Sequence, residues 1–161
     1  RWFVGDVKEV SALADTLVFN YAVDDSSSTL LRFASGAHGY VDAFFCVPDA
    51  SVLSRLEIYG SRGSILAEGT IGQSSGGTMV AYLEEGERGY DAQQAREAAQ
   101  VKPQPITATP VNPYTGEIEY LSRCIETRQA PTLNSLEEGL QTLAVAEAAY
   151  RSARTGTREA L

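Results

Sequence analysis

The sequence predicts an α+β fold: a large, mostly antiparallel β-sheet with helices packed on one face and the other face available for dimerisation. Three observations support this class. Short β-rich runs follow one another between residues 7 and 84, separated by turn-forming segments. Two segments near the C-terminal end combine helical periodicity with capping residues. Alternation in residues 37–47 leaves neither side of that run a plainly charged, solvated face.

Length and charge bound the class of protein. With 161 residues, of which 43% are hydrophobic, the chain is large enough to bury one core without disulfides, so we expect a single domain. The formal net charge is −8 and the basic residues are scattered, which leaves no basic surface for a phosphate backbone. Nucleic acid is therefore not an expected partner.

Cysteine usage and hydropathy favour a cytoplasmic protein. The cysteines, Cys46 and Cys124, form no Cys-x-x-Cys spacing, so we expect reduced thiols and no structural metal. No apolar run approaches about 18 residues, so no membrane segment is expected. The sequence starts at Arg1 and enters a strand-like run almost at once, from which we expect a piece of a longer chain.

Six strands are predicted before residue 85. They lie at residues 7–13, 28–34, 37–47, 52–59, 64–68 and 78–84. Turn-forming residues separate them, with Ser35-Gly36 and Ser61-Arg62 at the positions of tight hairpin turns. Residues 85–106 are polar and end at Pro103 and Pro105, which predicts a short helix or a loop.

The segment Gly60-Ser61-Arg62-Gly63 has two interpretations, a phosphate-cradling loop or a hairpin turn. A phosphate loop requires a helix immediately after it, because the helix N-terminus supplies oriented N–H groups and the positive end of the dipole. The residues after Gly63 are "SILAE", a further strand. The sequence therefore favours a hairpin in which glycine supplies the special backbone conformation.

The first predicted helix follows Asn112, a capping residue, and Pro113, which suits the first helical position. Its apolar stripe consists of Tyr114, Ile118, Leu121 and Ile125. Because this stripe is amphipathic, we expect the helix to lie on another element.

The second predicted helix opens at Ser135 with a capping box, reaches about Arg154 and stops at Gly156. Small residues lie around its circumference: Gly139, Ala144, Ala146, Ala148, Ala149 and Ala153. We interpret this helix as sandwiched between its own sheet and a further surface. The alternative is that the alanines serve helix propensity alone.

The strand at residues 37–47 indicates a second apolar sheet face. Alternation places Ala37, Gly39, Val41, Ala43, Phe45 and Val47 on one side, and His38, Tyr40, Asp42, Phe44 and Cys46 on the other. Since two helices cover one face, the other face predicts an interface, and a two-fold homodimer is the simplest assembly.

No catalytic constellation is evident from the residues alone. His38, Asp42 and Cys46 are about 13 Å apart along one strand, whereas zinc ligands lie about 2 Å from one ion, so a metal site is disfavoured. Asp24 and Asp25 precede a strand, where turn chemistry is the favoured role.

The order of several segments resembles the C-terminal domain of the Gfo/Idh/MocA oxidoreductases, over nearly the whole chain. These segments are "GDVKEVSA", "DDSSSTLLRFASGAHGYV", "LEIYGSRGSI", "NPYTGEIEYLSRCIETRQAPT" and "LEEGLQTLAVAEAAYRSARTGT". The resemblance implies that residues 1–161 are the substrate and dimerisation domain of a two-domain enzyme. It also implies an N-terminal Rossmann domain, absent from this chain, which binds NAD or NADP and carries a catalytic lysine. The aspartate and histidine that complete proton transfer are implied on the helix just before the first strand, also outside this chain.

The resemblance implies hydride transfer between the nicotinamide and a carbinol carbon of a sugar, cyclitol or related polyol. It places substrate-binding positions at Asp49, Ser51, Arg55, Asn112 and Tyr114, and no catalytic, cofactor-binding or metal-binding residue in this chain. Each of the five also has a structural interpretation as turn former, strand edge, helix cap or core aromatic. Pro48 interrupts the strand before them and departs from the family pattern.

Two functions are compatible with these expectations. The first is the C-terminal part of an NAD(P)-dependent oxidoreductase, inactive by itself, which forms a homodimer or a dimer of dimers through its sheet face. The alternative is a free-standing dimerisation or ligand-binding module without redox activity, because fold and function separate readily.

Overall fold

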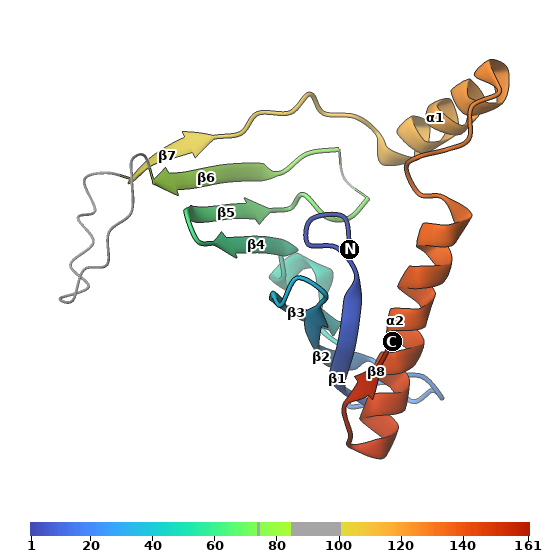
Figure 1. Ribbon diagram of the computed structural model, residues 1–161. Coiled ribbons are helices and arrows are strands. Elements are labelled where there is room, and N and C mark those ends of the chain that lie inside the picture. The colour runs from blue at the N-terminus through green and yellow to red at the C-terminus, as the bar shows by residue number, and fades with distance from the viewer. Residues whose placement is uncertain (74, 85–100) are drawn as a thin grey trace. The chain divides into compact units, whose positions relative to one another are not determined.

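The computed structural model describes residues 1–73, 75–84 and 101–161, which belong to two compact units (Figure 1). The first unit comprises Arg1–Ser51 and Ala130–Leu161, and the second comprises Val52–Gln129. Within the described residues, each unit contains a four-stranded antiparallel sheet and one α-helix, so the predicted α+β class is confirmed. The strands expected in one large sheet are hydrogen-bonded as these two sheets.

The sheet of the first unit has the strand order β3-β2-β1-β8. Its strands are β1 (Val7–Asp15), β2 (Ser26–Phe33), β3 (His38–Phe44) and β8 (Glu159–Ala160). The predicted turn at Ser35-Gly36 joins β2 to β3, and Gly36 has the positive φ of 88° that such turns require. The C-terminal strand β8 was not predicted; it pairs with β1 and completes the sheet.

Strand β3 ends three residues earlier than predicted. The Cys46 N–H donates to Asp25 O (3.1 Å) and the Val47 N–H donates to Phe44 O (3.3 Å), so the chain turns away from the β2 ladder before Pro48. Proline restricts the residue before it and supplies no N–H, which is consistent with a strand that stops here.

Helix α2 (Leu136–Thr155) packs on β1, beside which it runs in Figure 1. Its predicted ends are confirmed. The Ser135 side chain accepts a hydrogen bond from Glu138 N–H, and Gly156 adopts the left-handed conformation with φ 68°. Both signals are local, which is why the sequence located this helix to within a residue or two.

The core of the first unit lies between α2 and the sheet. Val10 and Ala148 are fully buried, and Val7 and Phe33 are nearly so. Val7 and Val10 both contribute to this core although they are three residues apart, because a β-bulge shifts the register between Val7 and Glu9. Phe33 also needs Gly39 in the next strand, since a Cβ at position 39 would lie 2.9 Å from its ring.

One buried hydroxyl ties the helix to the sheet. Ser152 is 2% exposed, and its Oγ accepts a hydrogen bond from Ala12 N–H (3.0 Å) and donates one to Thr157 O (2.6 Å). Ala12 lies beyond the two residues of β1 that pair with β8, so the hydroxyl satisfies an amide near the end of that ladder. Because Ser152 is small and polar, α2 can approach β1 closely without leaving buried polar groups unpaired.

The sheet face opposite α2 forms what we call the outer face. The register places Leu13, Leu30, Tyr40 and Phe44 on it, and these side chains are 47–71% exposed. Polar pairs are interspersed, among them Ser28 Oγ donating to Asp42 Oδ1 at 2.6 Å. The predicted second apolar face is therefore present, whereas its occupant stays a prediction.

Helix α2 has a second apolar stripe opposite its buried one. Leu136, Leu140, Leu143 and Tyr150 are 55–75% exposed, while Ala148 and Ser152 face β1. Helical spacing places these two groups on opposite sides of the helix. Of the two contacts predicted for this helix, the one with its own sheet is observed, and the one with a further surface stays a prediction.

The sheet of the second unit has the order β4-β5-β6-β7. Its strands are β4 (Arg55–Gly60), β5 (Gly63–Glu68), β6 (Thr78–Glu84) and β7 (Val101–Pro105). Gly60 and Gly63 face each other across the β4–β5 hairpin, as predicted. A strand begins at Gly63, so the interpretation of this segment as a hairpin is confirmed.

Strand β7 corrects the expectation of a helix or loop through residue 106; residues 85–100 lie outside the described residues. Pro103 and Pro105 sit opposite Tyr82 and Val80 at the edge of the sheet. The Ile106 N–H donates to Met79 O (2.9 Å), and successive backbone groups alternate in direction, so both proline nitrogens face the open edge. Proline is tolerated in an edge strand and blocks further pairing there.

Helix α1 (Pro113–Thr127) begins as predicted, with Asn112 Oδ1 accepting from Thr115 N–H at 3.1 Å. No residue of α1 is buried. Its apolar stripe is 52–69% exposed at Tyr114, Ile118, Leu121 and Ile125. The helix is therefore confirmed, whereas its apolar stripe is not buried by the described residues.

The hairpin predicts a sharp difference between its two glycines. Gly63 has φ 142°, and an added Cβ would lie 1.9 Å from the Tyr82 carbonyl oxygen. Gly63→Ala should therefore destabilise the protein by roughly 3 kcal/mol, measured by chemical denaturation.

Gly60→Ala is the matched control for this prediction. Among the described residues, an added Cβ there would meet Gly63 O at 3.8 Å, an ordinary contact. This variant should stay within about 0.5 kcal/mol of the parent. Equal effects of the two substitutions would contradict the assigned hairpin geometry.

Candidate functional site

The five predicted substrate-binding residues are divided between the units. Asp49 and Ser51 form the short 3-10 helix η1 (Asp49–Ser51) of the first unit. Arg55 begins β4 in the second unit, and Asn112 and Tyr114 stand at the start of α1. All five side chains are accessible to solvent.

The η1 turn uses one of its polar side chains internally. The Ser51 hydroxyl donates to Pro48 O at 2.7 Å, and the Ser51 N–H donates to the same oxygen at 2.9 Å. Asp49 is exposed at the start of this turn. The turn therefore presents one carboxylate on a backbone that Pro48 and Ser51 hold in place.

Arg55 lies opposite Glu68 in the β4–β5 ladder, and its Nε is 3.1 Å from Glu68 Oε1. The two side chains are 65% and 48% exposed. An ion pair this accessible contributes little to stability, because water competes for both charges. Its guanidinium can therefore exchange the carboxylate for another oxygen-rich group at small cost.

Asn112 and Tyr114 differ in how far the fold already uses them. The Asn112 side-chain oxygen is committed to capping α1. Tyr114 is 52% exposed, so its ring and hydroxyl are open to a ligand. Among the five, Arg55 and Tyr114 combine exposure with groups suited to hydroxyl or carboxylate oxygens.

The disfavoured interpretation of His38, Asp42 and Cys46 as a metal site receives no support. Asp42 accepts a hydrogen bond from Ser28 Oγ, and Cys46 and Cys124 are free thiols. Within residues 1–73, 75–84 and 101–161, no group of three or more His, Cys, Asp or Glu side chains could hold a metal ion.

The most elaborate polar site in the first unit is built around Asp25, which is 1% exposed. Its carboxylate accepts backbone N–H hydrogen bonds from Leu17 (2.8 Å), Val18 (2.9 Å) and Phe19 (2.9 Å). These bonds, those from Leu17 and Phe19 foremost, lower the pKa of Asp25 below its usual 3.8. The predicted turn role is confirmed for Asp25, whereas Asp24 accepts a hydrogen bond from the Tyr150 hydroxyl of α2. The three amide donors could not be identified from the sequence.

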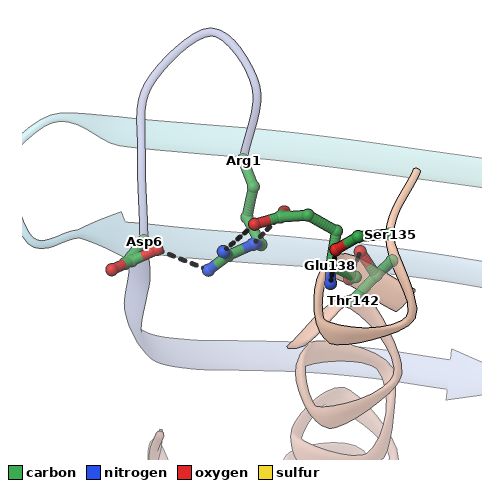
Figure 2. A network of polar contacts seen from close by, with 5 residues as sticks. All are labelled: Arg1, Asp6, Ser135, Glu138 and Thr142. Carbon is green, nitrogen blue, oxygen red and sulfur yellow. Dashed lines mark hydrogen bonds and ion pairs between the residues drawn. The ribbon is translucent and has the colours of Figure 1, made fainter. Parts of the chain in front are cut away.

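A second polar network, shown in Figure 2, joins the first residue to α2. The Arg1 guanidinium donates from Nε to Glu138 Oε2 (3.1 Å) and from Nη2 to Glu138 Oε1 (2.9 Å). The same group also contacts Asp6. Hydrogen bonding to Arg1 lowers the pKa of Glu138. In the capping box that opens at Ser135, Glu138 is the third residue after the cap, and its carboxylate holds Arg1.

Comparison with known proteins identifies the class of this fold. The profile of a family described as "Oxidoreductase family, C-terminal alpha/beta domain" matches residues 1–161. The chain therefore belongs to the Gfo/Idh/MocA oxidoreductase family, as its C-terminal domain. Comparison with curated protein sequences gives no match.

Several solved structures share the fold. An aldose-aldose oxidoreductase from Caulobacter crescentus, complexed with glycerol, is 24% identical with a TM-score of 0.75 over 98% of this chain and 42% of its own. A levoglucosan dehydrogenase in complex with NADH and L-sorbose is 19% identical with a TM-score of 0.76, over 99% of this chain and 46% of its own.

A third similar structure is the WlbA dehydrogenase from Bordetella pertussis in complex with NADH and UDP-GlcNAcA. It is 24% identical with a TM-score of 0.64, over 99% of this chain and 40% of its own. The chain thus spans less than half the length of these proteins.

Among the described helices of this chain, none has the length and apolarity needed to cross a membrane.

The Asp25 site predicts a defined acid response. A carboxyl group whose pKa is lowered by folding stabilises the native state above its unfolded pKa, and this contribution is lost as pH falls through the folded value. Exchange of the Leu17, Val18 and Phe19 amides, measured by hydrogen exchange, should therefore become faster relative to unstructured amides below about pH 4.

Substitution separates this effect from general acid unfolding. Asp25→Asn should lower the melting temperature at pH 7 by several degrees and weaken its acid dependence. Asp42→Asn is the control, because the exposed Asp42 carboxylate accepts from Ser28 Oγ on the outer face. A melting temperature that responds equally to both substitutions would contradict the special role of Asp25.

Proposed function

We propose that residues 1–161 form the substrate-side and self-associating domain of an NAD(P)-dependent oxidoreductase acting on a sugar, cyclitol or related polyol. The family match over the whole chain carries this proposal. The names of similar structures support the substrate class, since they include an aldose-aldose oxidoreductase and a dehydrogenase bound to L-sorbose. The levoglucosan dehydrogenase and WlbA dehydrogenase structures both contain NADH, which supports a nicotinamide cofactor for the longer protein.

The one segment that resembled a phosphate loop has the geometry of a hairpin instead. Gly60 and Gly63, which resembled a phosphate loop, close a hairpin, and β5 continues directly from them. A pyrophosphate would need the N–H groups of a helix N-terminus at this position. We therefore assign NAD or NADP binding to an N-terminal domain of the longer protein, and no step of the reaction to the described residues of this chain.

The contribution of this chain would be to bind and orient the substrate. The proposed contacts are Asp49, Ser51, Arg55, Asn112 and Tyr114. Arg55 is the strongest candidate, because its exposed ion pair with Glu68 leaves the guanidinium able to donate to substrate oxygens. Orientation of a bound polyol accelerates the reaction because it fixes the position of the reacting carbon, even where the catalytic groups lie in another domain.

Self-association is proposed through the outer face of the first sheet. Leu13, Leu30, Tyr40 and Phe44 supply apolar contact area there, and a two-fold axis would bring this face against itself. The expected assembly is a homodimer or a dimer of dimers. The free cysteines, Cys46 and Cys124, are compatible with the reducing cytoplasm, where we propose that the protein acts.

Calorimetry tests the proposed division of labour. NADH or NADPH should bind the full-length protein that contains these residues and should show no binding to residues 1–161 alone. Measurable affinity of the 161-residue chain for either dinucleotide would overturn the assignment. A full-length protein that binds neither dinucleotide would favour the alternative, a dimerisation or ligand-binding module without redox activity.

Steady-state kinetics of the full-length protein test the substrate site. Arg55→Gln should raise KM for the polyol about tenfold with little change in kcat, because a charge-assisted hydrogen bond to bound substrate is lost. Arg32→Gln is the matched control, since Arg32 also pairs across strands with a glutamate, Glu9, at 3.5 Å. Equal KM values for the two variants would exclude Arg55 from the substrate site.

A further inference from the structure

The loop between β1 and β2 exposes an unusual amount of apolar surface. Together with Phe45, which comes directly after β3, it forms what we call the aromatic loop, residues 16–24 and 45. Its apolar side chains are 40–79% exposed, namely Leu17, Val18, Phe19, Tyr21, Val23 and Phe45. A surface this apolar on one short segment marks an interaction site more often than chance exposure.

The backbone of the aromatic loop is held by polar groups on its inner side. The buried Asp25 carboxylate accepts from three consecutive backbone N–H groups at its start. The Thr16 hydroxyl donates to Val23 O (2.6 Å), and the Tyr150 hydroxyl of α2 donates to Asp24 Oδ1 (2.7 Å). The Cys46 N–H donates to Asp25 O (3.1 Å), which connects the Phe45 segment to the same frame.

These hydrogen bonds lower the entropy cost of binding a partner. A loop that must become ordered on association loses part of the gain from its contacts, whereas one already held in place does not. The aromatic loop therefore has the two properties of an interface hot spot, namely aromatic side chains and a backbone fixed before the partner arrives.

The exposed rings form one continuous surface. Phe19 stacks on Tyr21 with ring centroids 5.5 Å apart, and it meets Phe45 at 6.2 Å in a tilted arrangement. A fully buried aromatic residue covers about 150–250 Å², and Phe19, Tyr21 and Phe45 still expose 40–79% of their surface. With Leu17, Val18 and Val23 added, the area available is of the order of the roughly 800 Å² per partner found in a standard interface.

Charge decides which partner fits. Residues 16–23 contain no charged side chain, and the flanking Asp24 and Asp25 are both engaged internally. The absence of a basic residue there gives nucleic acid and anionic membranes no attraction to the loop. Two copies of a chain of net charge −8 repel each other over much of their surface, and an uncharged patch is where they approach at least cost.

We propose that the aromatic loop is a self-association site, at which two copies of this chain meet about a two-fold axis. The proposal extends the proposed function, since both require copies to associate, but it uses a surface different from the outer face. The loop lies beyond the strand ends, whereas Leu30 and Tyr40 of the outer face lie within β2 and β3. Use of both surfaces would produce a dimer of dimers.

Sedimentation equilibrium over a range of concentrations tests the proposal on the protein and two double variants. Phe19→Ser with Phe45→Ser removes the rings of the loop, and Leu30→Glu with Tyr40→Glu places charge on the outer face. The loop variant should weaken one association step at least about tenfold, as loss of a hot spot does. The outer-face variant should retain that step and lose the other.

Leu136→Ser with Leu140→Ser is the control, because it removes exposed apolar surface elsewhere in the same unit and should leave the loop-mediated step intact. Far-UV circular dichroism verifies folding, and Phe45→Ser alone replaces the double variant if that variant unfolds. Unchanged association of the loop variant overturns the proposed role of the aromatic loop. If the outer-face variant loses an association step in the same experiment, the proposed self-association through the outer face stands. A protein that is monomeric at every concentration overturns both.

Discussion

The close approach of α2 to β1 is the constraint on which the first unit depends. Ala148 is fully buried against the sheet, where Val10 is also fully buried. One turn further on, the Ser152 hydroxyl accepts a hydrogen bond from the Ala12 N–H and donates one to the Thr157 carbonyl. A larger side chain at either helix position would hold the helix away from the sheet. An apolar side chain at 152 would remove the hydrogen bonds of the Ala12 amide and the Thr157 carbonyl. This contact joins Arg1–Ser51 to Ala130–Leu161, segments that the whole second unit separates in sequence.

Polar interactions between distant residues then complete this unit. After Gly156 the chain reverses, β8 pairs with β1, and the Leu161 N–H reaches Lys8 O. Arg1 contacts Glu138, 137 residues away, and Tyr150 contacts Asp24. Each of these groups is satisfied by a partner on another element, so the apolar side chains of the aromatic loop and the outer face can stay exposed on a well-ordered framework. Exposure on such a framework is the reason why we propose both surfaces for self-association.

The candidate substrate site was predictable only in its local parts. The sequence correctly assigned Asn112 as a helix cap, and it placed Arg55 in a strand, because capping and alternation depend on a few neighbouring residues. No local pattern distinguishes an arginine that binds substrate from one that pairs with Glu68, and both descriptions are compatible with the observed exposure of Arg55. The choice of these five residues therefore came from family resemblance, and the structure adds which of their polar groups are already used within the fold.

The sequence by itself determined the hairpins, both helix starts, the stop at Gly156 and the α+β class. Each of these depends on backbone preferences or hydrogen bonds that span four residues or fewer, so neighbouring residues in the sequence determine it. Only the tertiary structure decided that Pro103 and Pro105 lie in an edge strand, that β8 exists, and that Asp25 collects three amides. Strand pairing and burial depend on partners that are distant in sequence and meet only on folding. The residues next to a proline or an aspartate carry no information about those partners.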